Sequence, residues 1–156
     1  MIYNKIELLK RNNRRNILKK EIVGITESSN VTLMETESTD GFKREVFSKL
    51  QTITNKFIIN GSGYQENIEK SIAYLKEAYT NNQIFSGEGW MLFFTESGIE
   101  PVKLTSKDVF NNLDGLGVLT KFSSGYGDFI WVSEDLKSGA CVERTEYYYE
   151  VSIWPY

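Results

Sequence analysis

The sequence contains no histidine and a single cysteine, Cys141. The absence of histidine excludes Ser-His-Asp and Cys-His catalysis, histidine-ligated zinc or iron, and any imidazole acid–base step. One cysteine excludes an internal disulfide and a cysteine-rich metal site, and it agrees with a reducing compartment. Carboxylates at the spacing of an EF-hand are absent as well. An enzyme built from this chain would have to work through carboxylates, Lys, Arg, Tyr or a bound cofactor. Our expectation is a protein with no catalytic residues, no metal site and no cofactor.

The sequence also lacks any long apolar run. No stretch approaches the roughly 20 consecutive apolar residues that a membrane-spanning helix needs. The basic segment Met1–Lys20 has no apolar stretch behind it of the kind that a secretory signal carries. A cytoplasmic protein without a membrane partner is therefore expected. The length of 156 residues fits a single domain over 1–156, whose folding buries roughly two thirds of the surface of the unfolded chain.

Charge is distributed unevenly along the chain, although the net charge is only −3. Residues 1–60 hold eleven Lys and Arg against seven Asp and Glu, a net of +4, whereas residues 61–156 hold seven against fourteen, a net of −7. Such a division favours one basic and one acidic surface, and it suggests a charged macromolecular partner. The alternative, in which the two sets of charges mix in space, is equally compatible with the sequence.

The middle of the chain predicts the centre of the core. A helix is expected over 64–81, because its apolar residues recur every three or four positions and so share one face: Tyr64, Ile68, Ile72, Leu75 and Tyr79. The segment Trp90–Phe94 that follows is apolar on both sides of a strand, which predicts a central strand covered on both faces. A strand over 56–60 is expected to lie beside it.

The remaining segments complete an α+β pattern. Helices are predicted over 4–21 and about 43–51, and a short helix is predicted after the capping sequence that begins at Thr105. The segment 43–55 fits helix and strand about equally. Further strands are predicted over 31–36, over 118–122 and 128–132 as a hairpin, and over 145–154. The fold class that follows is a single α+β domain with a mostly antiparallel sheet and helices packed on one face.

The last quarter of the chain combines acids with aromatic side chains. Residues 125–156 hold six Asp and Glu, only two Lys and Arg, and eight aromatic residues. In the strand over 145–154, alternation predicts a buried face of Thr145, Tyr147, Tyr149, Val151 and Ile153. The opposite face is expected to meet water or a partner, and it holds Glu146, Tyr148, Glu150, Ser152 and Trp154. Aromatic anchors in a field of one sign are typical of a protein-binding surface.

A family resemblance is carried by two segments, Gly87-Glu88-Gly89-Trp90-Met91-Leu92-Phe93-Phe94 and the ending from Tyr147 to Tyr156. With its size, its acidity and its lack of histidine, the chain resembles the immunity proteins of bacterial contact-dependent growth inhibition and related polymorphic toxin systems. The resemblance implies a binding protein, not an enzyme, whose partner is a cognate toxin domain, with a nuclease as the expected class. The residues proposed to contact that partner are Asp128, Glu134, Glu146, Tyr148, Glu150 and Trp154.

Two alternatives remain open. A nucleic-acid-binding or regulatory domain would use the basic residues of the first helix, Arg11, Arg14, Arg15, Lys19 and Lys20, although a solvated helix face explains them more simply. A histidine-free hydrolase would use a pair of carboxylates, which sequence spacing alone does not identify. The oligomeric state is not indicated.

Overall fold

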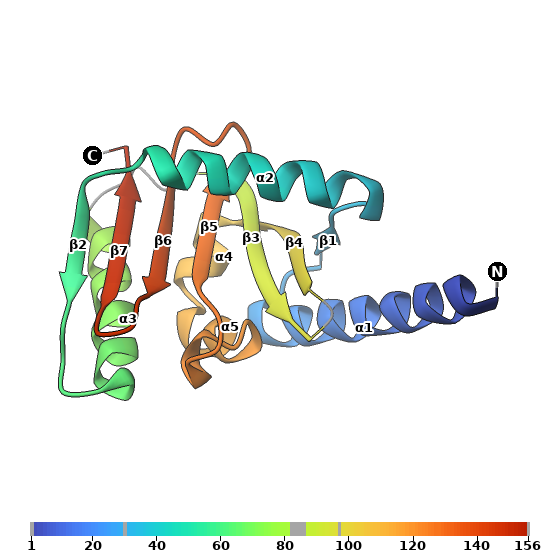
Figure 1. Ribbon diagram of the computed structural model, residues 1–156, viewed down its shortest axis with the longest axis horizontal. Helices are drawn as coiled ribbons and strands as arrows, with labels where there is room; N and C mark the ends of the chain where they lie inside the picture. The colour runs from blue at the N-terminus through green and yellow to red at the C-terminus, as the bar shows by residue number, and fades with distance from the viewer. Residues whose placement is uncertain (1, 30, 82–86, 97, 156) are drawn as a thin grey trace.

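Seven strands form one sheet in the order β1-β4-β3-β5-β6-β7-β2, and every neighbouring pair among the described residues is antiparallel (Figure 1). The computed structural model describes residues 2–29, 31–81, 87–96 and 98–155. The strands are β1 (Thr32–Leu33), β2 (Lys56–Ile59), β3 (Glu88–Thr95), β4 (Gly98–Thr105), β5 (Phe129–Ser133), β6 (Gly139–Arg144) and β7 (Tyr149–Trp154).

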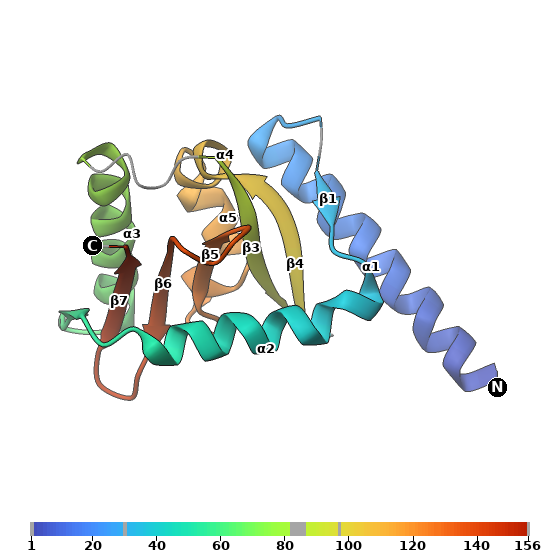
Figure 2. The same ribbon diagram turned by 90° about the horizontal axis from the view of Figure 1, so that it is seen from above.

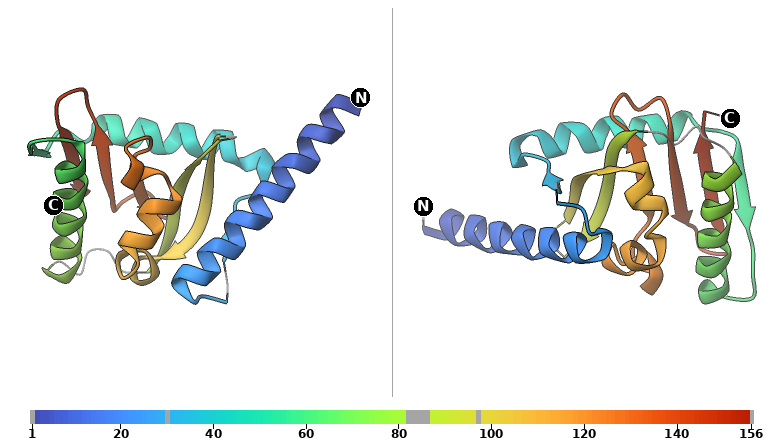
Figure 3. Two further views of the ribbon diagram at one scale, coloured as in Figure 1. Left: turned by 90° about the horizontal axis from the view of Figure 1, so that it is seen from below. Right: turned by 180° about the vertical axis from the view of Figure 1, so that it is seen from behind.

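Helices cover the sheet on both faces. They are α1 (Ile2–Thr26), α2 (Thr36–Thr52), α3 (Tyr64–Asn81), α4 (Ser106–Phe110), α5 (Leu113–Leu119) and the 3-10 turn η1 (Phe122–Ser124). The helix α2 crosses the face that is turned toward the viewer in Figure 1, here called the front face. The other helices lie behind the sheet, on the back face (Figures 2 and 3).

Two apolar cores follow from this arrangement. The back core packs α1, α3, α4 and α5 against one side of the sheet and includes Met91 and Phe93. The front core packs Val46 and Leu50 of α2 against the other side and includes Leu92. The prediction that Trp90–Phe94 is a central strand covered on both faces is confirmed, because β3 pairs with β4 and β5 and its side chains alternate between the two cores.

The α+β class and the antiparallel sheet are confirmed. The expectation that helices lie on one face holds for α1, α3, α4 and α5 and is wrong for α2. The reason is that the strands at the centre of the sheet are apolar on both sides: β5 is buried along its whole length. A sheet of this kind needs cover on both faces, and α2 supplies it on the front face.

Two predicted strand pairings are wrong. The predicted strand over 56–60 exists as β2, yet it pairs with β7 at the edge of the sheet and not with β3. The predicted hairpin of 118–122 with 128–132 does not form, because α5 and η1 occupy most of its first half. Leu113 and Leu116, three residues apart, bury one face of α5 in the back core.

The strand that forms a hairpin with β5 is β6, a strand that the sequence did not predict. It begins Gly139-Ala140-Cys141-Val142, whose small side chains give a weak signal for a strand. Gly139 is required there by close packing, since a Cβ atom at this position would lie 2.6 Å from Cζ2 of Trp154. The small residues of β6 thus make room for the large ring on the neighbouring strand.

The ambiguous segment 43–55 is helical as far as Thr52, within an α2 that begins at Thr36. The predicted strand over 145–154 is shorter at its start, because β7 begins at Tyr149 and residues 145–148 form the turn from β6. The predicted cap of the short helix is confirmed, since the hydroxyl of Thr105 accepts a hydrogen bond from the N–H of Asp108 at 3.1 Å. Within the described ranges, no helix has the length and apolar character that a bilayer crossing requires.

Candidate binding surface

Three carboxylates lie in register across three adjacent strands of the front face. Glu143 of β6 stands opposite Glu150 of β7. Phe129 of β5 pairs with Val142, so Asp128, one residue before it, stands opposite Glu143. All three point toward the α2 side, because they lie an even number of residues from the front-core residues of their strands. We call Asp128, Glu143 and Glu150 the acidic row.

The acidic row lies on the part of the front face that α2 leaves uncovered. Figure 1 shows α2 crossing one end of the strands, the end where β5 and β7 finish, while the row lies toward the other end. The side chains of Glu143 and Glu150 are 34% and 21% exposed, so they are reachable by a partner and yet partly withdrawn from water. Partial desolvation of this kind strengthens their attraction for a cation.

Apolar side chains flank the row on both sides. Phe94 of β3 is the next front-face position beyond Asp128, and it is half-buried. Ile58 of β2 pairs with Glu150 at the other end of the row, and it is exposed. Phe47 of α2 lines a cavity together with Asp128 and Glu143. The surface is thus an acidic centre between apolar borders.

Lys56 of β2 is the cation that the structure places against this row. Its Nζ lies 3.3 Å from Oε2 of Glu150 and 3.9 Å from Oε1 of Glu143. Burial opposes the charge of Lys56, but the two glutamates outweigh that effect and raise the pKa of its ammonium. One lysine between three carboxylates leaves the row with a net negative charge.

Asp128 and Cys141 have pKa values shifted upward. Burial raises the pKa of the Asp128 carboxyl, the backbone N–H of Arg144 opposes the rise through a hydrogen bond at 3.1 Å, and the charge of Glu143 adds to it. Burial likewise raises the pKa of the Cys141 thiol well above its ordinary value, and the neighbouring carboxylates raise it further. The thiol therefore stays protonated and unreactive at neutral pH.

The acidic row is an extended line of carboxylates and not a compact cluster. Neighbouring strands lie about 4.8 Å apart, so the three carboxylates are spread along a line. Among the residues that the structure describes, no group of three or more His, Cys, Asp or Glu could hold a metal ion. The cavity lined by Asp128 and Glu143 has a volume of about 190 Å³, below the roughly 300 Å³ at which ligand pockets begin.

The structure brings together two of the predicted contact residues, Asp128 and Glu150. Two more lie next to them in the turn from β6 to β7: Glu146 is exposed and Tyr148 is half-buried. Tyr148 is held in that turn by Thr145, whose hydroxyl accepts a hydrogen bond from the N–H of Tyr148 at 3.1 Å. These four residues lie at one end of the sheet.

Glu134 and Trp154 lie elsewhere, so their assignment to the same surface is corrected. Glu134 follows β5 at the opposite end of the sheet from Asp128, and its Oε1 lies 2.8 Å from Nζ of Lys103. Trp154 is 3% exposed, and its indole N–H donates to the carbonyl oxygen of Leu136. The alternation of β7 does point Trp154 to the front face, but α2 covers that part of the face.

The predicted faces of the last strand are also corrected in part. Tyr149 and Val151 are buried in the back core as expected. Tyr147, assigned to the same buried face, is 76% exposed because it lies in the turn before β7. Glu143, the middle of the acidic row, was not predicted as a site residue. It lies two residues after Cys141 and therefore on the same face of β6, but this placement follows only once β6 is recognised as a strand.

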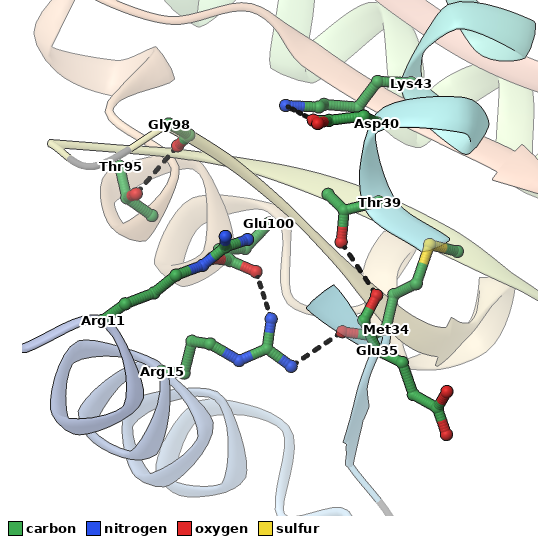
Figure 4. A network of polar contacts seen from close by, with 10 residues as sticks. All are labelled: Arg11, Arg15, Met34, Glu35, Thr39, Asp40, Lys43, Thr95, Gly98 and Glu100. Atoms are coloured by element: carbon green, nitrogen blue, oxygen red, sulfur yellow. Dashed lines mark hydrogen bonds and ion pairs between the residues drawn. The ribbon is translucent and has the colours of Figure 1, made fainter. Parts of the chain in front are cut away.

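Some of the basic residues of α1 form ion pairs with a buried carboxylate (Figure 4). Glu100 of β4 is 4% exposed, and its carboxylate receives Arg15 Nη1 at 2.6 Å and Arg11 Nε at 3.3 Å. Arg15 also donates from Nη2 to the carbonyl oxygen of Met34, next to β1. Two of the five cations proposed for nucleic acid thus anchor α1 to the sheet.

The other three cations, Arg14, Lys19 and Lys20, are exposed on α1. At 100° per residue they point in directions about 100° or more apart around the helix axis, so they form no continuous stripe. The arrangement therefore favours the solvated helix face over a phosphate-binding surface.

A family model, described as "YxiF protein", matches residues 18–154. The chain belongs to the YxiF family. The YxiF match spans all seven strands and includes the acidic row, and it begins after Arg11, Arg14 and Arg15. The description of the YxiF family names no activity. No curated protein and no solved structure gives a significant match to this YxiF chain.

Proposed function

We propose that this protein binds and neutralises a cognate toxin domain in the cytoplasm, and that it does so by covering the toxin's active site with the acidic row. The observation that carries the proposal is the alignment of Asp128, Glu143 and Glu150 across three strands, toward the strand ends that lie away from α2. The protein acts by binding and performs no chemistry of its own.

A nuclease is the toxin class that such a surface fits. Enzymes that cleave nucleic acids carry a basic cleft for the phosphate backbone, and a line of carboxylates can occupy that cleft in place of phosphates. The apolar border formed by Phe94, Phe47 and Ile58 supplies contact area and excludes water from the charged centre. Charge complementarity of this kind makes association fast and sensitive to salt.

The test uses a candidate toxin domain, sought first in the product of the gene immediately upstream, and a variant in which the row is neutralised, Asp128→Asn/Glu143→Gln/Glu150→Gln. We expect affinity to fall by about 100-fold at low salt, which corresponds to about 2.7 kcal/mol. We also expect the association rate to lose most of its dependence on ionic strength. Binding is measured by surface plasmon resonance over a range of salt concentrations, and protection is measured as survival of cells that express the toxin.

The matched control neutralises two acids at the other end of the sheet, Glu88→Gln/Glu134→Gln. Both are exposed and both are bound to Lys103, so the control removes charge from the surface without touching the row. We expect its affinity to stay within about twofold of the unmodified protein, because exposed ion pairs away from an interface contribute little. Equal losses in the two variants would mean that net charge acts and that the row is not the binding surface.

A further inference from the structure

The strand β2 is an exposed edge of the sheet. It stands last in the strand order, and no described strand pairs with its outer side. Both of its central side chains are half exposed, Phe57 at 51% and Ile58 at 47%. An edge with unpaired main-chain N–H and C=O groups and apolar side chains is a ready template for another strand.

The opposite edge of the sheet, at β1, is covered, in contrast to the edge at β2. There β1 is only two residues long, and α1 lies beside it (Figure 2). Arg15 of α1 donates to the carbonyl oxygen of Met34, directly after β1, and so ties α1 to this edge strand. Short edge strands and covering helices are the usual means of blocking unwanted pairing. Among the described residues, β2 has no comparable cover on its outer side (Figures 1 and 2).

The edge at β2 offers three kinds of contact to an added strand. Alternate residues of β2 direct main-chain N–H and C=O groups away from β7, so they can pair with a new strand. On the back face, Phe57 stacks on Tyr74 of α3, with ring centroids 4.6 Å apart and planes 12° apart. On the front face, Ile58 continues the line of the acidic row beyond Glu150.

We propose that the partner of this protein adds an extended segment to the outer edge of β2, with cationic side chains on the front face and apolar side chains on the back face. An added strand would lie about 4.8 Å from β2 and so about 10 Å from β7. From there a Lys or Arg side chain can lie over Ile58 and reach toward Glu150, while an apolar side chain packs on Phe57 and Tyr74. The inference rests on the proposed function, because it assigns the acidic row to the same partner.

Charge decides between this partner and a second copy of the chain. Pairing of β2 with β2 of another copy would form one continuous sheet with two acidic rows on it. The like charges of Asp128, Glu143 and Glu150 in both copies would oppose that arrangement, whereas a cationic segment lowers the repulsion among them. The front face therefore selects a basic strand over its own copy.

The experiment uses the full chain and a synthetic heptapeptide of alternating lysine and valine as the probe. Two further peptides of the same sequence carry a methyl group on every second backbone nitrogen. One is methylated at the odd positions and the other at the even positions, so each has one hydrogen-bonding edge blocked. We expect the plain peptide to slow amide hydrogen exchange in β2 by about tenfold or more at saturation. We expect one methylated peptide to bind about tenfold more weakly, because it cannot donate to β2.

Two variants, each with one isoleucine replaced by lysine, test the position of the added strand. Ile58→Lys places a like charge in the path of the peptide and is expected to weaken binding by about tenfold. Ile6→Lys makes the same change at a side chain of matched exposure on α1, 46% against 47%, and is expected to leave binding unchanged. If Ile6→Lys weakened binding as much as Ile58→Lys, the peptide would be responding to overall charge and the assignment to β2 would be wrong.

The failure of strand addition is distinguishable from the failure of the proposed function. If both methylated peptides bind as the plain peptide does, or if β2 gains no protection, strand addition is wrong. The acidic surface would still stand if Glu143→Gln/Glu150→Gln abolished binding of the same peptides. A dimer in sedimentation analysis that Ile58→Lys dissociates would assign the edge to a second copy and would also overturn the proposal.

Discussion

Asp128 carries a charge that its surroundings disfavour. Burial raises the pKa of its carboxyl, and the nearby charge of Glu143 contributes in the same direction. When a carboxyl has a higher pKa in the folded state than in the unfolded state, the folded protein is most stable below the unfolded value, here 3.8. That stability is lost as the pH rises through the folded pKa. Keeping such a group charged at neutral pH is expected of a binding site and not of a scaffold.

Replacing Asp128 by asparagine is therefore expected to stabilise the protein while it weakens partner binding. The asparagine side-chain oxygen can still accept the hydrogen bond from the N–H of Arg144, and the disfavoured charge is gone. Urea unfolding at pH 7 should give a higher free energy of unfolding for Asp128→Asn than for the unmodified protein. Near pH 3, where the carboxyl is protonated in both states, the difference should vanish.

Asp135→Asn is the control, because its pKa is shifted the other way. Hydrogen bonds from the N–H of Lys137 and the hydroxyl of Ser133 lower the pKa of the Asp135 carboxyl. A lowered pKa contributes stability above the unfolded value and loses it as the pH falls through the folded one. Neutralising Asp135 should thus lower stability at pH 7. A gain for both variants would refute the account of Asp128.

At the scale of the single residue, the sequence located part of the surface. Asp128 and Glu150 were found because acids and aromatics crowd the last quarter of the chain, and both lie in the acidic row. Glu134 was drawn into the same set by that crowding, although the sheet separates it from Asp128 by the length of β5. Composition reports which residues are near in sequence, whereas a surface depends on which strand ends meet.

The helix α2 determines which front-face residues of the last strand, β7, are buried. Alternation along β7 assigns Trp154 to the front face correctly, but a strand pattern does not say which helix crosses that face. Phe42 of α2 contacts Trp90, with ring centroids 5.8 Å apart, and Val46 and Leu50 continue the contact toward Trp154. Trp154 is therefore a core residue under α2, where it would otherwise have been an aromatic anchor for a partner.

Truncation of Trp154 to alanine tests whether this side chain is part of the front core. The ring is buried in the front core and its N–H is bonded to the carbonyl oxygen of Leu136. We expect Trp154→Ala to lower the free energy of unfolding by about 3–5 kcal/mol, measured by urea unfolding, because a large cavity opens beneath α2. Tyr147→Ala, at a ring that is 76% exposed, should change it by less than about 0.5 kcal/mol. If both variants changed the free energy of unfolding by similarly small amounts, Trp154 would be a surface residue and its assignment to the front core would be wrong.

Elements with strong periodicity were predicted, and those held by packing alone were not. The helix α3 has the bounds that its apolar spacing indicates, and β3 is central because it is apolar on both sides. In contrast, β6 begins at Gly139, where a Cβ atom would meet the ring of Trp154 and the carbonyl oxygen of Trp131. The need for small side chains at that place arises only when β5 and β7 lie on either side of it.

Across the whole molecule, the order of the strands was beyond the reach of the sequence. β2 and β7 are separated by about ninety residues and pair at one edge, while β3 and β4 follow one another in the chain and pair toward the other side of the sheet. Local patterns carry no information on such distant pairing. The uneven charge of the chain did indicate a charged surface, and three of the acids in its second part meet as the acidic row.

Stability should decline from the centre of this sheet to the β2 edge, and native-state hydrogen exchange can measure that gradient. The strand β3 pairs on both sides and its central side chains are fully buried, so its amides should exchange only through global unfolding. The amides of β2 that are bonded to β7 lie at an exposed edge, and local opening should let them exchange about 100-fold faster. A paired residue such as Val151, in β7 but one strand further in, should fall between the two. Equal protection of β2 and β3 would show that the edge opens only with the whole sheet, and it would contradict this gradient.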